Sequence, residues 1–341
     1  MRITTGWQAS GPTTALRRTS LERRDLRPDD IAVRVDYCGV CHSDLHALTE
    51  APVVPGHEFT GVVTGIGREV TAFSVGDRVA VGNIVDSCGE CPMCEAGQEN
   101  FCHSFPTLTY GGTDRQDGST TLGGYSREYV VRDTFAYPLP AGLDPAAAAP
   151  LMCAGVTVWE PLRHLGVGPG SRVAVAGLGG LGHLAVKMAA ALGATTTVIS
   201  RTPGKRADAR RLGAHDLIDS TDTQHMATAR DTFDVVLDTI SAPHALAPYL
   251  KLVALDGTLS LLGHLGPVTV ETTDLLIGRK KLSSAGSGGR AATAEMLQFC
   301  ADKSISADVE VLPSAQVNTA LDRLRRNDVR YRFVLDMSDL D

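Results

Sequence analysis

The sequence has no long apolar run, no leader resembling a signal peptide and no extended block of basic residues. The first residues, from Met1 to Thr5, are not the apolar core of a secretory signal, and no segment reaches the roughly 20 consecutive apolar residues that a membrane helix needs. The net charge of −7 gives no general attraction to nucleic acid or anionic lipid. We therefore expect a cytoplasmic protein with no nucleic-acid or membrane partner.

The composition is not extreme in any direction. Hydrophobic residues make up 43% and charged residues 21% of the chain, near the averages of globular proteins. Those values exclude a disordered, collagen-like or coiled-coil protein. Because 341 residues exceed the size at which one hydrophobic core usually stops growing, the length predicts two domains.

The first part of the chain has the pattern of an irregular β-rich domain. Short β-branched runs alternate there with Gly, Pro and Asp, and they predict strands over residues 31–37, 60–66, 77–82 and 125–131. This pattern of short strands ends at the Ala-rich run between Pro145 and Pro150, where we expect the domain boundary. A segment after about Gly286, with a helix over 315–326 and a strand over 331–335, is expected to return to this domain. We therefore predict one domain from residues 1–149 and 287–341.

The middle of the chain alternates strand-like and helix-like segments. The predicted strands are residues 172–176, 195–199, 216–219, 235–238 and 258–263, and the predicted helices are residues 181–192, 205–212 and 245–254. Such alternation indicates a doubly wound parallel sheet with helices on both faces. Residues 150–286 are therefore predicted to form an α/β domain of the Rossmann type.

A glycine-rich loop follows the first predicted strand of that domain and opens its first helix. It reads Gly177, Leu178, Gly179, Gly180, Leu181 and Gly182. In this context the first Gly permits a tight turn, the second allows close approach of a pyrophosphate and the third allows the helix to pack on the strand. Phosphates are then received by free N–H groups at the helix start. The alternative is a glycine-rich turn without a ligand.

The end of the second predicted strand indicates which dinucleotide binds. A site for NAD usually has Asp or Glu there, to bind the ribose 2′-hydroxyl. This chain instead has Ser200, Arg201 and Thr202, followed by Lys205. A hydroxyl with a guanidinium and an ammonium favours a 2′-phosphate, so we predict NADP(H). The alternative is that the basic side chains are ordinary solvated residues at a helix start.

Four of the eight cysteines lie close together in sequence, at Cys88, Cys91, Cys94 and Cys102. Four thiolates at these spacings can close a tetrahedron around Zn²⁺ with no open position, which is typical of a structural site. Two disulfides or an iron–sulfur cluster are the alternatives. In a reducing compartment, metal ligation is the preferred reading of clustered cysteines.

A second group of possible ligands is dispersed. It comprises Cys41, the pair His57 and Glu58, and Cys153. Two thiolates and one imidazole on zinc leave a fourth position for water or substrate. Spacing alone does not join these residues, because a lone Cys in an apolar stretch is more often a small core residue.

The ordered set of motifs resembles the zinc-containing medium-chain alcohol dehydrogenases, in the cinnamyl-alcohol-dehydrogenase-like branch. The motifs are residues 39–44, 56–58, 76–79, the four-cysteine segment, residues 153–157, the glycine-rich loop and residues 328–333. The resemblance implies a GroES-like β-barrel catalytic domain that holds both zinc ions, joined to the Rossmann domain. It also implies a homodimer, for which residues 259–270 are a candidate contact.

The resemblance implies roles for individual residues. It makes Cys41, His57 and Cys153 ligands of a catalytic zinc, with Glu58 able to approach the metal, and makes the four clustered cysteines the structural site. It further implies that Ser43 bonds the substrate oxygen, that His46 belongs to a proton relay, that Asp44 supports His57 and that Thr157 contacts the nicotinamide. Ser43 and Asp44 have helix capping as an alternative role, and His46 has that of a surface histidine.

We therefore expect a zinc enzyme that transfers hydride between NADP(H) and a primary alcohol or aldehyde, aromatic or allylic, acting as an aldehyde reductase. The alternative is an NADPH-dependent reductase of an iminium or activated alkene. That shift would remove a zinc ligand or the relay, and both are present. The segment from Ala47 to Val54 is shorter than is usual in the branch, which predicts a changed entrance to the substrate pocket.

Overall fold

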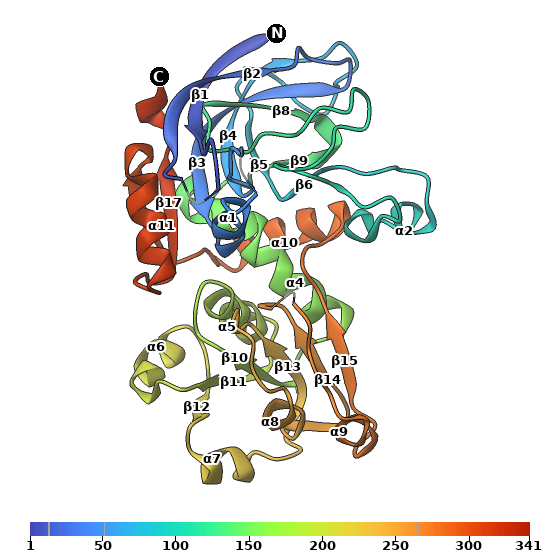
Figure 1. The fold of residues 1–341 in the computed structure, drawn as a ribbon. Coiled ribbons are helices and arrows are strands. Elements are labelled where there is room, and N and C mark those ends of the chain that lie inside the picture. The colour runs from blue at the N-terminus through green and yellow to red at the C-terminus, as the bar shows by residue number, and fades with distance from the viewer. Residues whose placement is uncertain (13, 51, 265) are drawn as a thin grey trace. The chain divides into compact units, whose positions relative to one another are not determined.

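The structure is a computed structural model that describes residues 1–12, 14–50, 52–264 and 266–341. The chain forms two compact units (Figure 1). The first comprises Met1–Cys153 and Gly289–Asp341, and the second comprises Ala154–Gly288. From the sequence, the chain was predicted to pass from one domain to the other after residues 149 and 286. Among the described residues, no helix is long and apolar enough to cross a membrane.

The first unit is built on a seven-stranded sheet to which both ends of the chain contribute. Its path runs β16-β17-β3-β4-β5-β9, and β8 pairs with β3. The strands are β3 (Asp30–Val40), β4 (Phe59–Ile66), β5 (Arg78–Val81), β8 (Glu128–Arg132), β9 (Ala136–Pro138), β16 (Val309–Pro313) and β17 (Arg332–Asp336). The antiparallel pairing of β17 with β3, with Phe333 opposite Val40, ties the C-terminal segment to the N-terminal part.

Smaller elements surround this sheet. Two hairpins are formed by β1 (Arg2–Gln8) with β2 (Arg17–Arg23), and by β6 (Ile84–Asp86) with β7 (Thr107–Leu108). The helices are α1 (His42–Ala47), α2 (Pro92–Glu95), α3 (Pro145–Ala148), α10 (Arg290–Asp302) and α11 (Val317–Arg325).

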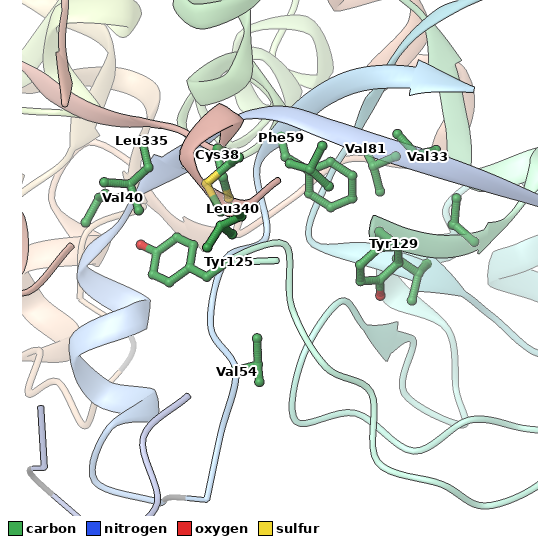
Figure 2. Packing of buried hydrophobic residues seen from close by; sticks show 14 of the residues in the cluster. Val33, Cys38, Val40, Val54, Phe59, Val81, Tyr125, Tyr129, Leu335 and Leu340 are labelled. Carbon is green, nitrogen blue, oxygen red and sulfur yellow. The ribbon is translucent and has the colours of Figure 1, made fainter. Parts of the chain in front are cut away.

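The core of the first unit lies between the sheet and the segments that cross it. Alternate residues of β3, among them Ile31 and Val33, are fully buried in this cluster. Figure 2 shows Val33 near Phe59 and Tyr129, and shows Tyr125 with its ring inside the cluster. Because strand side chains alternate between two faces, this pattern fixes which residues of β3 face inward.

The second unit is a six-stranded parallel sheet in the order β12-β11-β10-β13-β14-β15. Its strands are β10 (Arg172–Ala176), β11 (Thr195–Ser200), β12 (Asp216–Asp219), β13 (Phe233–Asp238), β14 (Val253–Leu261) and β15 (Lys281–Ser284). Its helices are α4 (Ala154–His164), α5 (Gly182–Ala191), α6 (Arg206–Arg211), α7 (Thr223–Thr228), α8 (Ala247–Leu250) and α9 (Thr272–Leu276).

The strand order reverses between β10 and β13, the two strands at the centre of this sheet. In open α/β sheets, ligands bind beyond the carboxyl ends of the strands at such a reversal. Helix α5 packs against β10 and β11 on one side of the reversal, and α8 packs against β14 on the other. Since parallel crossovers are right-handed, these helices cover opposite faces of the sheet. The parallel sheet confirms the expected α/β class.

The structure departs from the predicted elements at several places, and three of them have a clear physical reason. The helix predicted over 245–254 is wrong beyond Leu250, because Val253 already pairs with Phe233 of the neighbouring strand. The strand predicted over 125–131 begins only at Glu128, because Tyr125 turns into the core. The N-terminal hairpin was not predicted, since its strands are rich in Arg and Thr rather than in apolar residues.

Candidate metal centres and cofactor site

The fold brings Cys41, His57 and Cys153 together from three distant parts of the first unit. Cys41 is the N-cap of α1, directly after β3, while His57 lies just before β4 and Cys153 ends a short 3₁₀ turn. The Sγ atoms of Cys41 and Cys153 are 3.9 Å apart, and His57 Nε2 lies 3.2 Å from Cys153 Sγ.

These three side chains fit a zinc ion. Zinc–sulfur bonds of about 2.3 Å in a tetrahedron place two sulfur ligands about 3.8 Å apart, close to the distance observed. All three ligand atoms lie within 4.8 Å of one another. Three protein ligands occupy three corners of the tetrahedron and leave a fourth for water or a substrate oxygen, as in catalytic zinc sites.

Asp44 is fully buried and organises this group. Its carboxylate accepts hydrogen bonds from the N–H of Cys41 at 2.9 Å, the N–H of Gly56 at 3.2 Å and the hydroxyl of Tyr125 at 2.9 Å. Its Oδ1 also lies 3.4 Å from Nδ1 of His57. A carboxylate on one imidazole nitrogen directs the other toward a metal. Asp44 also caps α1 through its bond with Cys41, so both predicted roles are geometrically compatible.

The ligands influence one another's protonation. A hydrogen bond with Cys153 lowers the pKa of Cys41 well below its ordinary range, and the same bond raises the pKa of Cys153. Burial disfavours the charged form of His57, but the carboxylate of Asp44 outweighs this effect and raises the pKa of His57. The thiolate form of Cys41, which is the form that binds metal, is therefore favoured.

Glu58 lies outside the three-residue group, although it follows His57 directly. Its carboxylate accepts a hydrogen bond from the guanidinium of Arg332 at the start of β17, and both side chains are buried. Burial raises the pKa of Glu58 to about 7, against the influence of Arg332. The sequence reading gave Arg332 no role, although it belongs to the motif over residues 328–333.

Two tyrosines of the site were also missed. The ring of Tyr110 lies against His57, with centroids 5.5 Å apart, and Tyr125 donates its hydroxyl to Asp44. No local motif marks either residue, because each reaches the site from the long irregular segment between β7 and β8. Their buried phenol groups have a raised pKa because of desolvation and the nearby Asp44, so they stay neutral hydrogen-bonding groups.

The remaining predicted residues of this unit lie on α1 and the segment after it. Ser43 Oγ is 3.7 Å from Cys41 Sγ and exposed to solvent. His46 is exposed on the last turn of the helix. The short segment that follows pairs with the N-terminal part through Ala9 and Val53. The N–H of each of these residues donates to the carbonyl oxygen of the other at 3.0 Å. Ala51 lies outside the described residues.

The four clustered cysteines also converge. Cys94 Sγ lies 3.9 Å from Cys88 Sγ and 3.6 Å from Cys91 Sγ. These distances match sulfur atoms around one metal ion, and they are far longer than a disulfide bond of about 2.05 Å. None of the four clustered cysteines is in a disulfide bond, so the disulfide alternative does not hold.

Backbone groups support negative charge in this cluster. The N–H of Cys88 lies 3.5 Å from Cys102 Sγ, and the N–H of His103 lies 3.5 Å from Cys91 Sγ. The bond from His103 lowers the pKa of Cys91 to about 6. The backbone therefore favours the thiolate of Cys91, whereas burial raises the pKa of Cys94 to about 11. Four sulfur ligands would close all four positions of the metal, which fits a structural zinc rather than a catalytic one.

In the second unit, the glycine-rich loop lies at the reversal of strand order. Gly177 follows β10 with a φ of +92°, which only glycine adopts readily. A Cβ on Gly182 would lie 2.1 Å from the carbonyl oxygen of Gly177, so α5 can approach the strand only without a side chain there. A Cβ on Gly179 would meet nothing within 4 Å. The loop thus offers open space beside backbone N–H groups, as a pyrophosphate requires.

The predicted ribose-binding residues follow β11. The Oγ of Ser200 accepts a bond from the N–H of Thr202 at 3.1 Å, and Arg201 is exposed. Lys205 Nζ donates to the carbonyl oxygen of Leu178 at 3.0 Å, which links the basic segment to the glycine-rich loop. Thr157 is buried in α4 of the same unit.

Comparison with known proteins identifies both units. Residues 27–141 match the alcohol dehydrogenase GroES-like domain and residues 180–302 match the zinc-binding dehydrogenase family. The chain is 44% identical over 330 residues to a probable formaldehyde dehydrogenase of Bacillus subtilis, covering 95% of this chain and 94% of the relative. It is 43% identical over 350 residues to an NADP-dependent alcohol dehydrogenase C of Mycolicibacterium smegmatis, covering 100% and 99%.

Among solved structures, a cinnamyl alcohol dehydrogenase from Sorghum bicolor superposes with a TM-score of 0.95. The two chains are 42% identical, and the match covers 98% of each. The expected combination of a GroES-like domain and a Rossmann domain is therefore confirmed.

Proposed function

The chain belongs to the zinc-dependent medium-chain alcohol dehydrogenases, in the cinnamyl-alcohol-dehydrogenase-like branch, and on that premise we propose that it reduces aldehydes to primary alcohols with NADPH. The observation that carries the proposal is the group Cys41, His57 and Cys153, which offers three ligands and an open fourth position. A zinc ion bound there supplies Lewis acidity toward a carbonyl or alcohol oxygen. The reverse oxidation uses the same groups.

The side chains around the ligands have separate tasks in this proposal. Asp44 holds His57 with Nε2 toward the sulfur atoms, as its contacts indicate. Ser43, on the exposed side of Cys41, hydrogen-bonds the substrate oxygen, and the exposed His46 exchanges the proton with solvent. Glu58 remains paired with Arg332 while the metal has its ligands.

Cofactor choice rests on the segment after β11. No carboxylate stands among residues 200–206, where an NAD-specific site usually has one. Arg201 and Lys205 supply positive charge for the 2′-phosphate, and Ser200 and Thr202 supply hydroxyls. The relative from Mycolicibacterium smegmatis, which is named NADP-dependent, supports this choice.

Aromatic and allylic aldehydes are the proposed substrate class. The sorghum relative is named a cinnamyl alcohol dehydrogenase, whereas the Bacillus relative is named a probable formaldehyde dehydrogenase. Both names refer to an aldehyde or its alcohol, which supports this class of substrate for the open zinc position. The short segment from Ala47 to Val54 gives reason to test bulky aldehydes as well.

The test follows NADPH oxidation by absorbance with a panel of aromatic, allylic and short aliphatic aldehydes. We expect kcat/KM to be higher for NADPH than for NADH, and Arg201→Ala to reduce this preference about tenfold or more, since it removes a charge-assisted bond. An enzyme that prefers NADH, or a panel on which only an iminium or alkene is reduced, would overturn the proposal.

We further propose a homodimer joined through the edge of the second unit's sheet. Strand β15 is one of the two edge strands, and the exposed apolar residues Leu255, Leu276 and Ile277 lie in the same part of the chain. An unpaired strand edge with apolar neighbours is suited to pairing with a second copy. Solution scattering at several concentrations tests this, and a monomer at all of them would exclude it.

A further inference from the structure

A hydrogen-bonded pair at the carboxyl end of β13, formed by Asp238 and His244, has no part in the proposed chemistry. Nε2 of His244 lies 2.8 Å from Oδ2 of Asp238, and Asp238 is only 2% exposed. The other ring nitrogen of His244, Nδ1, lies 2.9 Å from the carbonyl oxygen of Ala242. Both nitrogens of this ring therefore face oxygen acceptors.

This arrangement requires an additional proton. A carbonyl oxygen only accepts, so Nδ1 of His244 carries a hydrogen, and the contact between Nε2 and Asp238 then needs one more, on either partner. If that proton leaves, Nε2 and the carboxylate present lone pairs to each other. In the other tautomer of the neutral ring, Nε2 carries the hydrogen, and Nδ1 then presents its lone pair to the carbonyl oxygen of Ala242. One of the two bonds is lost in either case.

The pair fixes the loop over residues 239–246, which begins beside the glycine-rich loop. Asp238 Oδ1 accepts the N–H of Ile240 at 3.0 Å, and Thr239 Oγ1 donates to the carbonyl oxygen of Ala176 at 2.8 Å. A Cβ on Gly177 would lie 2.9 Å from Thr239 Oγ1. The residues that follow β13 thus pack directly against the first glycine of the predicted phosphate site.

We propose that His244 is a positioning residue for the dinucleotide: with the shared proton in place, it holds the loop over residues 239–246 in the shape that borders the glycine-rich loop. The inference rests on the proposed function, since it assumes that a dinucleotide binds at this loop. His244 acts through Asp238 and the backbone. Loss of the proton frees the loop and weakens binding of the cofactor.

Several charged and titratable groups surround the pair. They are Asp238 on β13, Tyr249 on α8, His264 after β14, Glu271 and Asp274 beside or on α9, and Arg201 after β11, which acts on Tyr249. Together with apolar neighbours, most of them line a cavity of about 350 Å³. Burial raises the pKa of Asp238, although His244 and His264 oppose this.

The test measures the Kd of the enzyme for NADPH by fluorescence from about pH 6 to about pH 9. We expect the Kd to rise about tenfold as the proton is lost, the size of one charge-assisted hydrogen bond at its lower limit. NADH is titrated in parallel, because it lacks the 2′-phosphate, whose own ionisation would otherwise contribute to the trend.

Two variants have opposite expected effects. His244→Asn removes the clamp, so the Kd should be about tenfold higher at low pH and nearly independent of pH. Asp238→Asn keeps the acceptor for Ile240 and offers an amide N–H to neutral His244, so the Kd should stay low over the whole range. His225→Asn, on α7 of the same unit, is the matched control and should retain the trend of the natural chain.

Hydrogen exchange of the amides over residues 239–246 gives a readout that needs no variant. Without cofactor, their protection should fall at high pH by more than the intrinsic rate explains. The inference is overturned if His244→Asn retains the pH trend, or if protection of the loop does not change. If the natural chain binds neither NADPH nor NADH, the proposed function itself fails.

Discussion

At the scale of the residue, Asp44 shows how one buried carboxylate serves several neighbours. Its two oxygens receive donors from Cys41, Gly56 and Tyr125, and one oxygen also faces His57. Each donor belongs to a different segment of the first unit. Asp44 therefore joins the cap of α1 to the orientation of the histidine.

Asp44→Asn tests this role. One carboxylate oxygen becomes an NH₂ group that faces donors, which leaves a buried donor without a partner and disturbs His57. We expect affinity for the catalytic zinc to fall about 10- to 100-fold, measured by competition with a chelator. The four-cysteine zinc is the internal control and should stay bound; its simultaneous loss would indicate general unfolding instead.

Glu58 and Arg332 form a second buried pair, which joins the start of β4 to β17. Arg332→Met leaves the carboxylate of Glu58 buried without its counter-charge. We expect a loss of about 3–5 kcal/mol in the free energy of unfolding, measured with urea. The double variant Glu58→Gln with Arg332→Met should be more stable than Arg332→Met alone. Equal stability of the two would show that the charge itself is not the cause.

At the scale of the element, the irregular segment between β7 and β8 is held by ion pairs. Arg27 donates to both oxygens of Asp114, at 2.8 and 3.0 Å, and to Asp117 at 2.7 Å. Burial opposes ionisation of Asp114, but Arg27 and nearby backbone N–H groups outweigh this and lower its pKa. This segment also carries Tyr110 and Tyr125, so its anchoring concerns the site.

The sign of the pH effect follows from the lowered pKa. The unfolded chain binds a proton at Asp114 at a higher pH than the folded chain, so the stabilisation is full above the ordinary carboxyl pKa of about 3.9 and is lost as the pH falls through the folded value. Asp114→Asn should lower Tm at pH 7. The difference in Tm between the variant and the natural chain should become smaller below about pH 4. A difference that stays constant with pH would contradict this assignment.

At the scale of the whole molecule, the two zinc sites are predicted to separate activity from stability. The group with Cys153 has an open position, whereas the group with Cys94 is closed by four thiolates. We expect two zinc ions per chain by metal analysis, and one in either Cys153→Ala or Cys94→Ser.

The two variants should differ in their consequences. Cys153→Ala should abolish aldehyde reduction with little change in Tm, because an open site contributes little to the fold. Cys94→Ser should lower Tm by several degrees, because a closed zinc site contributes directly to folding. Full activity in Cys153→Ala would overturn zinc catalysis, and an unchanged Tm in Cys94→Ser would remove the structural role of the lobe.

The spacing of residues along the sequence was enough to predict part of this protein's sites and secondary structure. The four clustered cysteines and the glycine-rich loop could be identified from sequence because their residues are neighbours along the chain, so backbone geometry alone limits how they can meet. The strand over Arg172–Ala176 was predicted at its observed bounds for the same reason. The helix predicted over 245–254 was wrong beyond Leu250, because pairing with a distant strand outweighed local preference.

Contacts between distant residues depended on the tertiary structure. Cys41, His57 and Cys153 meet only through the pairing of β3 with β4 and the return of the chain before α4, and family resemblance had to join them in the sequence. The partners Asp44 with Tyr125, Glu58 with Arg332 and Asp238 with His244 carry no motif. The distances between these partners are set by sheet register and by packing of the core, which one sequence does not reveal. The residue types and their spacing in the sequence determined which chemical groups are available, and the tertiary structure decided which of these groups meet.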